Sequence, residues 1–160
     1  MEEIMIGIDP GLDGAFAFVP VRGDRPWVYD TPTISIQGAT RQHRHCEPAE
    51  ITAILKSAMA DYRLRATIEG VHAMPRQGVS SMFSLGEGYG MWLGILAALG
   101  IPYSIVSARD WKRAYGLDSD KGRSRAEALR RWPTLADQLN RKRDHGRAEA
   151  LLIARYRIGA

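Results

Sequence analysis

Two short apolar runs of the chain each end in an acidic side chain. Residues 4–8 lead to Asp9, and residues 65–68 lead to Glu69. Runs of this kind, closed by turn-forming residues, are typical of buried strands. If the two strands lie side by side and parallel, Asp9 and Glu69 meet at the carboxyl edge of a sheet, where open α/β folds keep their sites. Two like charges placed there either share a proton or hold a divalent cation.

A third acidic side chain lies near the end of the chain, in an apolar segment. Glu149 is surrounded in sequence by alanines and leucines, whereas a solvated helix face would carry more polar neighbours. His145 precedes it by four residues, so the two side chains share one helix face, as a metal-binding pair can. Asp144 would point elsewhere from that helix, and an N-cap is its alternative role. Each of these residues, taken singly, also has a structural explanation. Asp9 could cap a turn, Glu69 could be a solvated strand end, and His145 could be a surface residue.

The residue types favour oxygen-loving cations and a polyanionic substrate. Three carboxylates and one imidazole suit Mg²⁺ or Mn²⁺ better than a structural zinc, for which the sequence has no Cys/His spacing. Two such ions can activate a water and stabilise the leaving oxygen of a phosphodiester. Residues 107–160 hold 14 Lys and Arg against 7 Asp and Glu, while the chain as a whole carries a net charge of +4. This basic last third indicates nucleic acid as the partner.

The hydrophobic pattern predicts the elements that position these side chains. The strand at residues 4–8 is expected at the centre of the sheet, with a turn at Gly23 and Asp24 between the two strands that follow it. The expected further strands are residues 15–21, 27–31, 65–68 and 102–106, and the expected helices are residues 47–62, 82–99, 108–115, 124–132 and 145–156. Residues 32–46 are polar and are expected to form a mobile loop. Strands followed by alternating strands and helices predict an α/β sheet of mixed direction with right-handed crossovers.

Length and composition bound the class of protein. The 160 residues, 45% hydrophobic and 25% charged, predict one globular domain over residues 1–160. Cys46 is the only cysteine and cannot form an internal disulfide. No stretch approaches 18 apolar residues and the first residues are acidic, so neither membrane insertion nor export is expected, and the protein is predicted to be cytoplasmic.

Taken in order, these residues resemble the RuvC-type Holliday-junction resolvases, and most of all their phage-type and organellar branch. The resemblance covers about residues 4–156 and rests on an ordered set of motifs. These are the IGIDPGL sequence at residues 6–12, Glu69 at a strand end, the glycine-containing segment 81–90, Lys112 after a strand, and the GRAEA sequence at residues 146–150.

The resemblance implies an α/β, RNase H-like mixed five-stranded sheet flanked by helices, and a homodimer that nicks four-way DNA junctions symmetrically. It implies two Mg²⁺ ions per active site, with Mn²⁺ able to substitute. The catalytic and metal-binding residues it implies are Asp9, Glu69, His145 and Glu149, with Asp144 as the rival of His145. Many relatives have aspartate where His145 stands, so activity is expected to fall on mild acidification.

The resemblance also implies where DNA is contacted. Basic residues around the expected site are Lys112, Arg113, Lys121, Arg123, Arg125, Lys142 and Arg147. Relatives insert a wedge into the junction from the loop at residues 70–79, where this chain offers His72, Met74 and Pro75. His72, Met74 and Arg76 of this loop are also expected to contact DNA. The expected setting is a bacterial or phage-infected cell.

Other functions share parts of this pattern. An RNase H-like nuclease acting on RNA/DNA hybrids, flaps or other branched DNA would use the same acids with a different groove. A non-catalytic, structure-specific DNA-binding module would bind DNA through the basic last third of the chain alone, and the acidic residues would only cap turns and helices. A sugar kinase or actin-like ATPase needs two related domains and a second glycine-rich phosphate loop, which 160 residues do not supply. No small-molecule substrate is expected.

Overall fold

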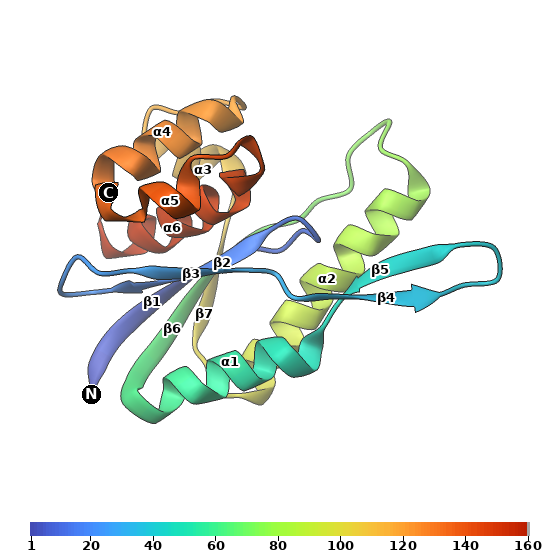
Figure 1. Cartoon of the computed structure of the whole chain (residues 1–160), viewed down its shortest axis with the longest axis horizontal. Coiled ribbons are helices and arrows are strands. Elements are labelled where there is room, and N and C mark those ends of the chain that lie inside the picture. The colour runs from blue at the N-terminus through green and yellow to red at the C-terminus, as the bar shows by residue number, and fades with distance from the viewer. Residues whose placement is uncertain (160) are drawn as a thin grey trace.

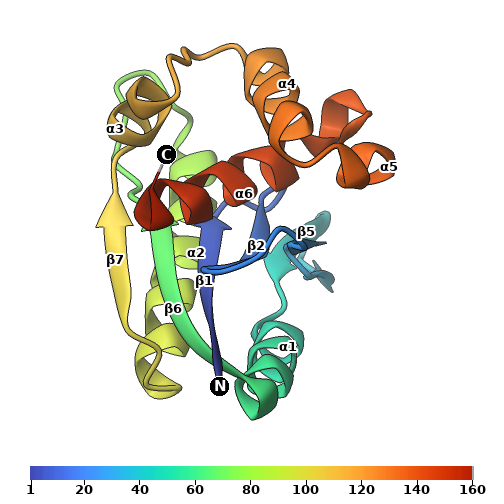
Figure 2. The ribbon, with the colours of Figure 1, turned by 90° about the vertical axis from the view of Figure 1, so that its left-hand side faces the viewer.

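A five-stranded sheet of mixed direction lies at the centre of the computed structural model, which describes residues 1–159 (Figure 2). The strand order is β3-β2-β1-β6-β7. β1 (Glu2–Asp9) is the middle strand, and β2 (Ala15–Pro20) and β3 (Trp27–Asp30) continue from it in an antiparallel meander. β6 (Tyr62–Glu69) pairs with β1 in parallel, and β7 (Tyr103–Val106) pairs with β6 in parallel. The predicted fold class is confirmed, including the central place of the first strand.

Helices cover both faces of this sheet (Figure 1). One layer contains α1 (Pro48–Asp61) and α2 (Val79–Ala98). The other contains α3 (Ala108–Ala114), α4 (Lys121–Arg131), α5 (Ala136–Leu139) and α6 (His145–Ile158), with short 3₁₀ turns at Pro133–Leu135 and Lys142–Asp144. In the part of the chain that the structure describes, no helix combines the length and the apolar character needed to cross a bilayer.

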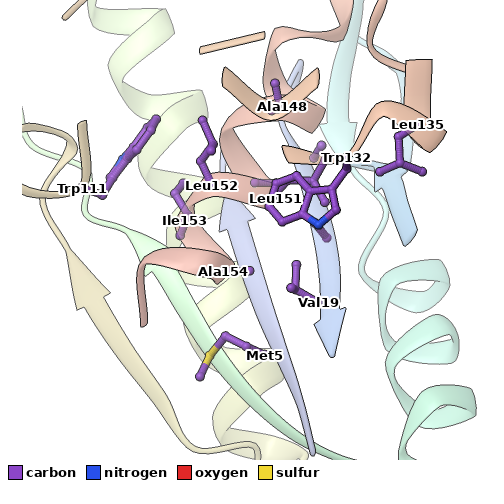
Figure 3. Close-up of a cluster of buried hydrophobic side chains, with 14 of the residues drawn as sticks. Met5, Val19, Trp111, Trp132, Leu135, Ala148, Leu151, Leu152, Ile153 and Ala154 are labelled. Atoms are coloured by element: carbon purple, nitrogen blue, oxygen red, sulfur yellow. The ribbon is translucent and has the colours of Figure 1, made fainter. Parts of the chain in front are cut away.

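Side chains alternate between the two faces of each strand, so the core consists of two clusters, one on each face of the sheet. The same alternation determines the face on which each acidic side chain lies. In β1, Ile4, Ile6 and Ile8 are buried against the layer of α1 and α2, whereas Met5 is buried in the cluster beneath α6 (Figure 3). Because side chains alternate between faces, Asp9 follows Met5 and lies on the α6 side. In β6, Ile68 belongs to the first cluster, so Glu69 also lies on the α6 side.

Two glycines allow α6 to approach the sheet closely. A Cβ on Gly7 of β1 would collide with the α6 backbone at Ala150 and Ala154. A Cβ on Gly146 would lie 2.8 Å from a carbonyl oxygen of the turn that follows β1. The absence of a side chain at Gly7 and Gly146 therefore allows α6 to pack close to β1, and this distance determines where the residues of α6 lie relative to the sheet.

Residues 32–46 do not form the predicted mobile loop, and that prediction is wrong. They form a two-stranded antiparallel ribbon of β4 (Thr33–Gln37) and β5 (Gln42–Cys46), separate from the main sheet. The alternating Thr-Ile-Ser-Ile pattern of β4 favours a strand. The turn is closed by a 2.9 Å hydrogen bond from the Gly38 amide to the Arg41 carbonyl. The polar composition of the segment obscured this pattern.

Candidate functional site

Three carboxylates far apart in the chain converge on one cleft. Asp9 ends β1, Glu69 ends the neighbouring parallel strand β6, and Glu149 lies one turn into α6. All three line a cleft of about 1240 Å³, together with His145 from the start of α6. The four residues that the sequence singled out as catalytic are therefore brought together at the carboxyl edge of the sheet.

Asp9 carries the electrostatic strain of this arrangement. The pKa of the Asp9 carboxyl is raised from 3.8 to about 7 by burial, and to a smaller extent by the nearby charges of Glu149 and Glu69. The Gly11 amide and Lys121 oppose the shift without cancelling it. A cation bound beside Asp9 would favour its charged form, because it would offset both the burial cost and the repulsion.

The other two carboxylates are each held by a neighbouring residue of α3. Trp111, fully buried, donates a 2.6 Å hydrogen bond from Nε1 to Oε2 of Glu69. Burial raises the pKa of Glu69, and the Trp111 hydrogen bond opposes that rise. Lys112 Nζ lies 3.3 Å from Glu149 Oε1, close enough for an ion pair. The two groups do not form a hydrogen bond, so the buried Oε1 of Glu149 has no hydrogen-bond donor.

His145 presents a nitrogen lone pair to the cleft. Its Nδ1 lies 3.3 Å from the Lys142 carbonyl oxygen, which can only accept, so the proton of the neutral ring belongs on Nδ1. Nε2 is then the acceptor and lies 3.2 Å from Lys121 Nζ. Metal-binding histidines are commonly oriented by such a carbonyl on the far nitrogen.

Asp144 does not join this group. Its side chain is 2% exposed and binds Arg141, whose amide donates a 2.9 Å hydrogen bond and whose guanidinium lies 3.0 Å away. Burial would raise the pKa of Asp144, but these hydrogen bonds and the charges of Arg141 and Arg147 hold it below its usual value. Asp144 therefore serves the chain reversal before α6, and His145 is the residue that lines the cleft.

The donor set fits a hard divalent cation. It offers three carboxylates and one imidazole. Among the carboxylates, Asp9 has a pKa raised by burial and by its acidic neighbours, and Glu149 has a buried oxygen that lacks a donor. As the side chains stand, no three Asp, Glu, His or Cys residues within 1–159 are close enough to enclose one ion. Trp111 and Lys112 engage two of the three acids.

The basic residues selected from the sequence fall into three groups. Lys112 and Lys121 line the cleft. Arg113 and Lys142 are exposed beside it in sequence but do not line it, and His72, Met74 and Arg76 are exposed in the loop between β6 and α2. The remaining three are engaged within the protein: Arg123 with Asp118, Arg125 with the Asn140 carbonyl, and Arg147 with Asp30.

The sequence did not single out two features of the cleft. One is Trp111, whose only signal was its place beside Lys112. The other is the wall formed by β5 and the turn before it, where Arg41, His43 and Arg44 line the cleft. The clustering of basic residues at 41–45 was a signal for this wall, and it was lost when the segment was interpreted as a loop.

Fold and site together define the class: an RNase H-like fold of the RuvC type, with acids from two parallel strands and a C-terminal helix. Two solved structures of RuvC from Thermus thermophilus share the fold at 16% sequence identity. The one in complex with a Holliday junction substrate has a TM-score of 0.59 and covers 98% of this chain and 96% of that one. The other has a TM-score of 0.54 and covers 94% and 90%.

A relative is also found in sequence. The chain is 32% identical over 140 residues to "Holliday junction resolvase MOC1, chloroplastic" from Chlamydomonas reinhardtii, which covers 80% of this chain. The chain spans 16% of the length of that relative. No family model matches the chain. The sequence and fold comparisons confirm the resemblance to RuvC-type resolvases.

Proposed function

We propose that this chain is a divalent-metal-dependent endonuclease that resolves four-way DNA junctions by paired nicking. The observation that carries the proposal is the convergence of Asp9, Glu69 and Glu149 in one cleft with Lys112 and Lys121. Support comes from the relative named as a Holliday junction resolvase and from the RuvC fold, one example of which was solved with a Holliday junction substrate.

Each side chain of the cleft has a different proposed role in phosphodiester hydrolysis. Asp9 would bind both cations, Glu69 and Glu149 would complete their ligand sets, and Nε2 of His145 would take the remaining position. Two Mg²⁺ ions, replaceable by Mn²⁺, would activate the attacking water and stabilise the leaving oxygen. Lys121 lies 3.2 Å from His145 Nε2 and Lys112 lies 3.3 Å from Glu149 Oε1. When these two contacts open, both ammonium groups are free to bind phosphate oxygens of the substrate.

We further propose that the active form is a homodimer built on α2. Gly88 of this helix faces the protein, where its Cβ would lie 3.1 Å from the Pro10 carbonyl oxygen, but Gly86, Gly90 and Gly94 face open space. Phe83, 72% exposed, extends this row toward the start of the helix. Small residues one turn apart let two helices approach closely, and a two-fold axis there would match the near two-fold symmetry of a four-way junction.

Cleavage of labelled synthetic DNA tests the proposal. Wild-type protein with Mg²⁺ is expected to nick a four-way junction in two opposed strands, and to leave it intact with EDTA. Glu149→Gln should lose nicking and keep junction binding, whereas the matched change Glu50→Gln, on the exposed surface of α1, should leave both unchanged.

Parallel substrates separate the alternatives. An RNA/DNA hybrid or a flap cleaved faster than the junction would assign the chain to another RNase H-like nuclease. Junction binding without any nicking, unaffected by Glu149→Gln, would identify a non-catalytic DNA-binding module. Either result overturns the proposed function.

A further inference from the structure

The carboxylate of Glu69 differs from the other two acids of the cleft, because a neutral side chain donates a hydrogen bond to it. Trp111 Nε1 lies 2.6 Å from Oε2 of Glu69. Within residues 1–159 this is the only hydrogen bond of the Glu69 side chain, so the second oxygen, Oε1, has no donor. Glu69 lines the cleft. One oxygen of this carboxylate is therefore engaged by the protein, and the other is free to bind a ligand.

The pairing of β6 with β7 brings Trp111 to this carboxylate. Glu69, the last residue of β6, lies opposite Val106, the last residue of β7. Ser107 then caps α3 by accepting a 3.1 Å hydrogen bond from the Asp110 amide. Trp111 follows one turn into this helix, which begins directly beside the end of β6. The strand register and the start of the helix therefore determine the contact.

Packing fixes the indole ring of Trp111. The ring is fully buried in the cluster that also contains Leu152 and Ile153 of α6 (Figure 3). Tyr115 of α3 packs edge-on against it, with 6.5 Å between the ring centroids. The Tyr115 hydroxyl in turn donates a 2.9 Å hydrogen bond to the Leu152 carbonyl. Because protein interiors are close-packed, a ring held in this way keeps its N–H directed at Glu69.

The number of oxygens that a carboxylate offers affects which cation it favours. Ca²⁺ takes about six to eight oxygen ligands and often binds both oxygens of one carboxylate, whereas Mg²⁺ requires nearly octahedral geometry and keeps several waters. A hydrogen bond to Oε2 of Glu69 competes with metal ligation by that oxygen, so it favours ligation through Oε1 alone. Groups that orient a metal ligand in this way commonly change metal affinity by about 10- to 100-fold when they are replaced.

We propose that Trp111 is a positioning residue, which makes Glu69 a single-oxygen ligand and thereby favours Mg²⁺ over Ca²⁺ at the site. This inference rests on the proposed function, because it concerns the cations of the proposed nuclease. Trp111 is buried behind Glu69 and acts only through it. Within residues 1–159, neither Asp9 nor Glu149 accepts a hydrogen bond from another side chain, so this restriction applies to Glu69 alone.

Replacing an indole by a phenyl ring at two positions separates positioning from packing. Trp111→Phe removes the N–H donor together with part of the buried ring. Trp132→Phe is the matched control, because Trp132 belongs to the same buried cluster (Figure 3), and Trp111 provides the only indole hydrogen bond within residues 1–159. Binding of Mg²⁺ and of Ca²⁺ is measured by isothermal titration calorimetry at one fixed pH without DNA. The readout is the ratio of the two dissociation constants and does not depend on nicking.

Trp111→Phe is expected to weaken Mg²⁺ binding by about tenfold and to change Ca²⁺ binding by less than about twofold. Trp132→Phe is expected to leave the ratio of the two dissociation constants unchanged within about twofold. Equal weakening of both cations by Trp111→Phe would assign Trp111 a purely structural role and overturn the inference. Unchanged binding of both cations would overturn it as well.

A second variant keeps the inference testable if Trp111→Phe does not fold. Benzothienylalanine at position 111 retains two fused rings and replaces the N–H by sulfur, so it removes the donor and keeps the packing. It is expected to shift the ratio of the dissociation constants as Trp111→Phe does, with a nearly unchanged Tm. An unchanged ratio would overturn the inference.

The role of Trp111 and the proposed function can fail separately. An unchanged ratio in variants that nick junctions normally in Mg²⁺ would refute only the role of Trp111. Wild-type protein that binds Mg²⁺ but nicks no DNA would refute the proposed function. Wild-type protein that binds neither cation would refute both.

Discussion

Replacing Asp9 with asparagine is expected to stabilise the metal-free protein, and to do so more as the pH rises. Burial and the charges of Glu149 and Glu69 raise the pKa of Asp9 from 3.8 to about 7 in the folded state. Well below pH 3.8 the carboxyl is protonated in both the folded and the unfolded chain, and its charge costs nothing. Between pH 4 and 7 the unfolded chain releases this proton while the folded protein retains it, so stability falls as pH rises.

The size of the effect follows from the shift. About three pKa units at 1.36 kcal/mol each give a cost of about 4 kcal/mol at pH 8, and the same linkage gives about 2 kcal/mol at pH 5. Asparagine keeps the shape of the side chain and carries no charge at any pH. The variant should therefore exceed the wild type in free energy of unfolding by a margin that grows by about 2 kcal/mol between pH 5 and pH 8.

Urea denaturation in EDTA at pH 5, 6, 7 and 8 measures this margin. Asp24→Asn is the matched control, because Asp24 is exposed in the turn at the far edge of the sheet, and its effect should stay within about 0.5 kcal/mol. A margin for Asp9→Asn that does not change with pH, or a variant less stable than the wild type at pH 8, would refute the electrostatic account of the site.

Three further changes probe other contacts. Trp111→Phe removes the hydrogen bond that lowers the pKa of Glu69, so the acidic limb of nicking against pH should move to higher pH, and an unchanged pH profile would contradict this. Gly90→Arg should convert the proposed dimer to a monomer, as measured by light scattering, whereas Ala53→Arg on the exposed face of α1 should not. A Gly90→Arg variant that remains dimeric would show that the interface lies elsewhere. Gly7→Ala should lower the free energy of unfolding by about 1 to 3 kcal/mol in urea, because its Cβ meets the α6 backbone; an unchanged value would show that α6 can shift freely.

The sequence could predict the acids of the site because their signals are local. A strand of period two ending in Asp9 or Glu69 determines both the end of the strand and the face of the sheet on which the acid lies. The four-residue spacing of His145 and Glu149 likewise determines a shared helix face. These patterns need no knowledge of the rest of the chain.

Other parts of the site depend on contacts between distant residues, which no local pattern records. Arg147 was selected as a DNA contact, yet it forms 2.7 Å hydrogen bonds with Asp30, 117 residues away. Trp111 reaches Glu69 across 42 residues. The β4–β5 ribbon was misjudged because a short strand with exposed faces has the composition of a loop, and only its strand pairing and the ion pair of Arg44 with Asp13 distinguish the two.

The close seating of α6 on β1 has a consequence for the protein during its synthesis. Asp9 leaves the ribosome 140 residues before Glu149, and Glu149 reaches the cleft only after its helix has docked beside Gly7. A nascent or partly unfolded chain therefore exposes its basic residues without a complete set of acids. Under the proposed function, such a chain would be unable to cut DNA, and the capacity to cut would arise only when α6 docks on the sheet.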